Sequence, residues 1–175
     1  MIISKRLQAI ASYLPEHCET AADIGTDHGY LPIYAIKNGL SKHMIAMDVK
    51  EGPLQKAKRN IEQEGLSQNI SLRLSDGFRN LKPGEADCAV ISGMGGDLMA
   101  RILEEGKDVA ESLDRLILSP QSELFKVRGW LSDHSFDFLD EEMLIAVSYT
   151  HLVGSVAAGG RGIGYRGCTS GRGGL

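Results

Sequence analysis

The sequence lacks the features that mark secreted, membrane-spanning and metal-clustered proteins. It has only three cysteines, Cys18, Cys88 and Cys168, which are odd in number and far apart. This excludes a disulfide framework and a clustered cysteine metal site. No apolar run reaches the roughly 18 residues needed to cross a bilayer, and the first residues carry no signal-peptide cleavage pattern. We therefore expect a cytoplasmic protein, and, because the five histidines show no metal-ligand spacing, no metal.

The sequence also lacks an excess of basic charge over most of its length. The first 145 residues hold all 23 acidic residues but only 16 of the 19 basic ones, which leaves them a net charge of −7. An acidic body is a poor electrostatic match for nucleic acid. If the partner is an RNA, we expect this part of the chain to bind it weakly.

Hydrophobic periodicity alternates between strand and helix over residues 1–145. Strands are predicted at residues 20–24, 44–49, 70–74, 88–91, 116–118 and 136–145, and helices at residues 4–14, 32–39, 52–64, 96–105 and 123–132. Such alternation is typical of βαβ units and a parallel sheet. We predict a doubly wound, Rossmann-like α/β domain over residues 1–145.

The end of the sequence breaks this pattern. Residues 151–175 include nine glycines and show neither a strand nor a helix period. One interpretation is a native flexible tail. We favour the other, in which residues 146–175 are a Gly-rich disordered segment of non-native sequence.

Polar and glycine residues follow several predicted strands, where ligands bind in open parallel sheets. The first such segment runs from Asp23 to Pro32. Gly25 permits a tight turn, and Gly29 permits close approach of a ligand to the backbone. Asp27 stands where a dinucleotide site has its second glycine, and its carboxylate would repel a pyrophosphate. The segment suits a cationic or amino-bearing ligand.

Three further strand ends extend the candidate site. Asp48 lies 23 residues after Gly25, at a distance typical of an acid that accepts hydrogen bonds from ribose hydroxyls. Asp76 and Gly77 follow the third strand, where a carboxylate can receive an adenine amino group. Residues 93–96 are three glycines and Met94, an open floor for a second substrate. Together these ends favour S-adenosylmethionine over NAD.

Six segments together resemble the TrmK family of bacterial tRNA (adenine-22-N1)-methyltransferases. They are Asp23 to Pro32, Asp48 to Leu54, Ser75 to Phe78, Ser92 to Gly96, Leu116 to Ser122 and Val127 to Leu131. The resemblance implies a class I methyltransferase fold that uses S-adenosylmethionine. It also implies that the last strand and a C-terminal helical domain of the family are missing here.

The resemblance also implies a role for each matching residue. The methionine end of S-adenosylmethionine falls at Asp23, Gly25 and Gly29, the ribose at Asp48, and the adenine at Asp76 and Gly77. Asp27 becomes the candidate catalytic acid. From the glycine cluster after the fourth strand, rather than from the resemblance, we predict that Gly93 binds the cofactor and that Met94 and Gly95 bind the substrate.

Arg6, in the first helix, is a further candidate for contact with a substrate phosphate. Other hypotheses stay open at this point: a methyltransferase acting on another RNA or a small molecule, an NAD-dependent oxidoreductase, or a protein that binds the cofactor without catalysis.

Overall fold

The computed structural model describes residues 3–146 and 149–159 of the chain. Its strands are β1 (Thr20–Ile24), β2 (His43–Asp48), β3 (Ile70–Leu74), β4 (Cys88–Met94), β5 (Arg115–Pro120), β6 (Phe136–Ala146) and β7 (Tyr149–Ala158). Its helices are α1 (Lys5–Ser12), α2 (Tyr30–Lys37), α3 (Glu51–Gln63), α4 (Gly96–Glu105), α5 (Lys107–Ser112) and α6 (Leu124–Asp133). Each predicted strand and helix is present, with boundaries shifted by a few residues.

The strands form one seven-stranded sheet in the order β3-β2-β1-β4-β5-β7-β6. Strands β1 to β5 pair in parallel, whereas β7 is antiparallel to both β5 and β6. The order reverses between β1 and β4, so the carboxyl ends of these two strands lie at the topological switch point. The predicted doubly wound fold is confirmed.

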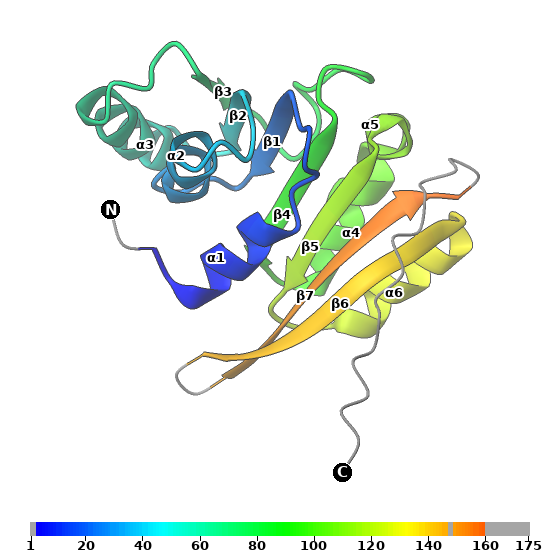
Figure 1. Cartoon of the computed structure of the whole chain (residues 1–175). Coiled ribbons are helices and arrows are strands. Elements are labelled where there is room, and N and C mark those ends of the chain that lie inside the picture. The colour runs from blue at the N-terminus through cyan, green and yellow to red at the C-terminus, as the bar shows by residue number, and fades with distance from the viewer. Residues whose placement is uncertain (1–2, 147–148, 160–175) are drawn as a thin grey trace.

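Successive side chains along each strand point to opposite faces of the sheet and pack into two separate hydrophobic cores. On one face, Ala22 and Ile91 pack with residues of α4, α5 and α6, such as Met99. On the other face, Ala21 and Val90 pack with residues of α1, α2 and α3. Figure 1 shows α2 and α3 beside β1 and β2, and α4 and α6 behind β5 and β7. Because helices cover both faces, the parallel strands are apolar along most of their length.

The expectation of a missing last strand is wrong. Residues 149–158 form β7, which lies between β5 and β6, so this part of the predicted tail is ordered β-structure. Val153 and Val156 are buried, and Gly154 pairs with both neighbouring strands. Hydrogen-bonding partners on both sides allow a segment rich in Gly, Ser and Ala to act as a strand despite its weak pattern. Residues 160–175 of the predicted tail lie outside the described residues.

Candidate functional site

The carboxyl ends of β1, β2, β3, β4 and β5 lie along one edge of the sheet, because these strands run parallel. Every predicted site residue except Arg6 lies at one of these ends or in the turn that follows. The sequence prediction of a site at this edge is therefore consistent with the topology.

The turn after β1 is fixed by the neighbouring strand. The backbone N–H groups of Gly25 and Thr26 both donate to the Met47 carbonyl, at 2.8 and 2.9 Å. Gly25 has φ +83°, in the left-handed region that favours glycine. A Cβ on Gly25 would lie 2.5 Å from the Met94 methyl carbon. Gly25 and Met94, predicted to bind cofactor and substrate respectively, are thus in direct contact across the switch point.

Gly29 has a packing role that the sequence did not reveal. It is buried, has φ +72° and precedes the first residue of α2. A Cβ on Gly29 would lie 3.2 Å from the Cβ of Ala57 in α3. Its small size therefore lets the start of α2 pack closely against α3, and its assignment to the cofactor stays a prediction.

Asp23 is buried beneath this turn, with 4% of its surface exposed. Burial raises the pKa of its carboxyl group to about 7, the Thr26 hydroxyl opposes this shift, and the negative charge of Asp48 adds to it. A carboxyl group so placed can stabilise the turn and a nearby positive charge, but it has little surface for direct ligand contact.

Asp27 and Asp48 lie side by side at the ends of β1 and β2. Asp27 has φ +48°, an uncommon conformation for a non-glycine residue, and 68% of its side chain is exposed. Its backbone N–H donates to Asp48 Oδ2 at 3.4 Å. Asp48 Oδ1 accepts from the Lys50 N–H at 2.9 Å. The Asp27 carboxylate therefore points to solvent, 3.4 Å from Nε2 of His28.

Asp76 and Gly77 form a preorganised turn after β3. The Ser75 hydroxyl accepts from the Asn80 N–H at 3.1 Å and donates to the Gly77 carbonyl at 2.9 Å. Hydrogen bonds from Arg101 lower the pKa of the Asp76 carboxyl group. An ionised carboxylate at this position is an acceptor, as binding of an adenine amino group requires.

The end of β4 is irregular, and it is joined to the end of β5. The register shifts between Ser92 and Met94, and Gly93 has φ +76°. The Met94 carbonyl accepts from the Gln121 N–H at 2.8 Å. A Cβ on Gly95 would lie 3.3 Å from an oxygen of the Glu123 carboxylate, and Glu123 itself has φ +43°. A glycine turn after β4 thus meets a turn with a left-handed non-glycine residue at the predicted substrate position.

Arg6 reaches this edge from α1. Its Nη1 atom is buried without a hydrogen-bond partner, and burial lowers the pKa of its guanidinium group. Both terminal nitrogens lie within 3.9 Å of the Cβ position of Gly93, and Gln121 Nε2 lies 4.0 Å from the same point. A half-buried cation whose buried Nη1 atom has no hydrogen-bond partner is costly, so the geometry favours an anionic ligand group over Gly93.

Sequence reasoning missed several residues at this edge. Thr26 and Gln121 lie within the segments quoted for the family resemblance, so their position alone was a usable signal. No sequence signal marked Arg101, because its contact with Asp76 spans 25 residues and depends on how α4 packs.

The comparisons with known proteins point to one family. A model described as a methyltransferase domain matches residues 3–152. The tRNA (adenine(22)-N(1))-methyltransferase of Bacillus subtilis is 42% identical over 165 residues, which cover 94% of this chain and 69% of that protein. The chain belongs to the TrmK family. The B. subtilis TrmK crystal structure matches with a TM-score of 0.86 over 90% of this chain and 67% of that one.

Two further structures of similar proteins hold the cofactor or its product. A Streptococcus pneumoniae protein in complex with S-adenosyl-L-methionine is 39% identical, with a TM-score of 0.86 over 90% of this chain and 74% of that one. Mycoplasma capricolum TrmK in complex with S-adenosyl-homocysteine is 28% identical, with a TM-score of 0.82 over 91% of this chain and 70% of that one. The fold class and the family resemblance predicted from the sequence are confirmed.

Two observations bear on other partners. No helix among residues 3–146 and 149–159 is long and apolar enough to span a membrane. In the same described part of the chain, no three His, Cys, Asp or Glu residues are grouped so as to hold a metal ion.

Proposed function

We propose that this protein transfers a methyl group from S-adenosylmethionine to N1 of adenine 22 in tRNA. The observation that carries the proposal is the 42% identity to the B. subtilis enzyme over 94% of the chain. It is supported by the meeting of the predicted strand ends at one sheet edge.

The residues at this edge are chemically suited to S-adenosylmethionine. The buried Nη1 atom of Arg6, which has no hydrogen-bond partner, suits a carboxylate or a phosphate. Asp27 and Asp48 supply the negative charge that suits a sulfonium and an ammonium group, and Asp23, buried beneath the turn, adds to this charge only where its carboxyl group is ionised. Asp48 and Asp76 are assigned to the ribose and the adenine, and Gly25, Gly77 and Gly93 allow the left-handed backbone of the turns that carry these residues. When bound, S-adenosylmethionine supplies an activated methyl group.

This reaction requires little acid–base catalysis from the protein. Neutral adenine already carries a lone pair on N1, so no strong base is needed, and alignment of N1 with the donor is the main requirement. The target base must leave its stack to reach the site. Gly95 and Met94 are assigned to the floor beneath it, and Met94 already contacts the turn at Gly25.

Asp27 is assigned the role of stabilising the positive charge that develops on the base. N1-methyladenine is cationic when it forms, and a fixed carboxylate nearby stabilises that charge. The left-handed backbone of Asp27 presents its side chain to solvent rather than to the fold, which supports a role toward a ligand.

Substitution of Asp27 tests this role. We expect Asp27→Asn to bind S-adenosylhomocysteine as the wild type does and to lose roughly 10²–10³-fold in kcat, the size typical of one charge-stabilising group. Asp108→Asn, which makes the same chemical change in the first turn of α5, is the matched control and should keep full activity. A wild-type kcat in Asp27→Asn would remove Asp27 from the mechanism.

Transfer of labelled methyl groups to unmodified tRNA, followed by nucleoside analysis, tests the function itself. We expect N1-methyladenosine, and none in a tRNA whose adenine 22 is replaced. Methylation of a metabolite or another RNA instead would contradict the proposal, as would binding of NAD without binding of S-adenosylhomocysteine.

Three further properties belong to the proposal. The net charge of −7 over the first 145 residues leads us to expect weak tRNA affinity that falls as salt rises. We expect a chelator to leave activity unchanged, because the proposed chemistry needs no metal. We place the protein in the cytoplasm, where its tRNA substrate is found.

A further inference from the structure

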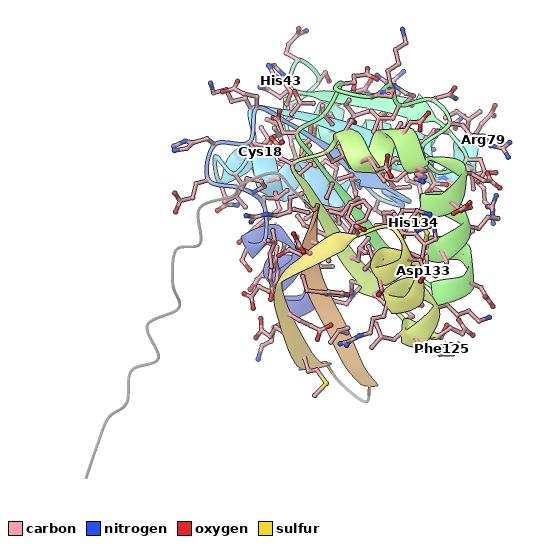
Figure 2. The ribbon with its side chains drawn as sticks, turned by 90° about the vertical axis from the view of Figure 1, so that its right-hand side faces the viewer. Cys18, His43, Arg79, Phe125, Asp133 and His134 are labelled. Atoms are coloured by element: carbon pink, nitrogen blue, oxygen red, sulfur yellow. The ribbon has the colours of Figure 1, made fainter. Side chains whose placement is uncertain are left out.

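Four alternating charges connect α4 to the turn after β3. Arg101 binds the Asp76 carboxylate through two nitrogens, at 3.0 and 3.3 Å. Arg101 also contacts Glu105 at 3.1 Å, and Arg79 contacts the same Glu105 side chain at 3.0 Å. Arg79 closes the ring at 4.0 Å from Asp76. Figure 2 shows Arg79 at the margin of the molecule, near the helix of α4.

Apolar contacts hold α4 to the same turn. A Cβ on Gly77, which has φ +58°, would lie 2.9 Å from a methyl carbon of Ile102. A Cβ on Gly106, just after α4, would lie 2.5 Å from the Cβ of Phe78. The backbone of residues 75–80 therefore lies tightly against α4 and is further fixed by the Ser75 hydroxyl. The Asp76 carboxylate in turn has Arg101 as its hydrogen-bond partner.

We propose that Arg101 is a positioning residue that orients the Asp76 carboxylate toward the adenine amino group of the cofactor. This rests on the proposed function, in which Asp76 meets the adenine. A bidentate arginine fixes both oxygens of a carboxylate in one plane and leaves each oxygen a further lone pair. Glu105 in turn limits the rotation of Arg101, and Arg79 limits that of Glu105.

The geometry of this network points to a role beyond surface stability. An isolated exposed ion pair contributes little, because long side chains lose entropy when they are held. Here the side chain of Asp76 is 31% exposed and that of Arg101 is 43% exposed, and both belong to a network with a bidentate contact. The network ends on a residue at the ligand-binding edge. Its expected effect is therefore on one contact of the cofactor, the 6-amino group.

A binding cycle tests this assignment. Calorimetry would measure the Kd of S-adenosylhomocysteine, and of the analogue in which hydrogen replaces the 6-amino group, for the wild type and for Arg101→Ala. We expect Arg101→Ala to raise the Kd of S-adenosylhomocysteine about tenfold, which corresponds to the loss of one well-placed hydrogen bond. The Kd of the analogue should stay within about twofold of the wild-type value. Arg101→Lys keeps the positive charge but cannot make the bidentate contact, so its Kd for S-adenosylhomocysteine should lie between those of the wild type and Arg101→Ala.

Control variants separate the possible outcomes. Lys107→Ala removes an exposed cation from the neighbouring helix, where it pairs with Glu111 at 3.7 Å, and should change neither Kd. Equal weakening of both ligands by Arg101→Ala, or of neither, would overturn the inference while leaving the proposed function intact. Failure of the wild type to bind S-adenosylhomocysteine would overturn both. If Arg101→Ala does not fold, Arg101→Lys and Glu105→Gln in the same cycle decide the question.

Discussion

The buried carboxyl group of Asp23 predicts how the stability of this protein depends on pH. Its pKa in the folded protein is about 7, against an ordinary value of 3.8. The folded protein therefore keeps this proton between about pH 4 and pH 7, whereas the unfolded chain loses it. Stability conferred by the protonated group is present at low pH and is lost as pH rises through 7.

The size of the effect follows from the shift. Each pKa unit corresponds to about 1.36 kcal/mol, so three units amount to about 4 kcal/mol of stability between low and high pH. Asp23→Asn has nearly the same shape and no charge to lose. Between pH 5 and pH 8 the wild type should lose about 3 kcal/mol of unfolding free energy relative to the variant.

Urea unfolding at the two pH values measures this difference. Trp130 is the single tryptophan and is largely buried, so its fluorescence reports the unfolding of the packed state. Other titrating groups act equally in both proteins and cancel in the comparison. An unfolding free energy that differs between wild type and Asp23→Asn by the same amount at pH 5 and pH 8 would refute the reasoning.

Two further predictions concern stability elsewhere in the fold. Hydrogen bonds from Arg73 lower the pKa of Glu85 to about 2, so the ionised carboxylate stabilises the fold above pH 4.5, and this contribution is lost as pH falls through 2. With allowance for solvent screening, Glu85→Gln should lower the free energy of unfolding by about 1–2 kcal/mol at pH 7 and by much less at pH 2, as measured by urea unfolding. A Cβ on Gly96 would lie 2.4 Å from the Glu123 carbonyl oxygen, so Gly96→Ala should lose about 1–3 kcal/mol and lower Tm. Gly129→Ala, also within a helix but with no atom within 4 Å of its Cβ position, should instead be neutral or gain up to about 1 kcal/mol; equal Tm values for the two variants would contradict the packing argument.

Much of the fold could be predicted because local pattern and global topology agree. The helix predicted at residues 96–105 is α4, and the helix predicted at residues 4–14 contains α1, which Ser4 caps with its hydroxyl accepting from the Leu7 N–H at 3.3 Å. Short apolar runs ending in glycine or acidic residues marked β1, β2 and β4. Once the strands are known to be parallel, their carboxyl ends must share an edge, and the candidate site follows.

What could not be predicted depends on contacts between distant segments. β7 carries Gly154, Ser155 and two alanines, and it forms because β5 and β6 pair with it on either side. The burial of Asp23, and hence its raised pKa, depends on strands on both sides of β1. The attachment of Asp76 to Arg101 requires α4 to pack beside the turn. None of these arrangements has a local sequence signature.

The place of β7 also sets an order in which the sheet can assemble. Among the described strands, β6 pairs with the sheet only through β7, although β6 precedes β7 in the chain and is therefore synthesised first. During synthesis, the five parallel strands can pair before β7, the strand that pairs with β6, has emerged from the ribosome. The β6–β7 hairpin can then join the sheet as one unit, after the carboxyl ends of β1 and β4 have come together on the far side of β5.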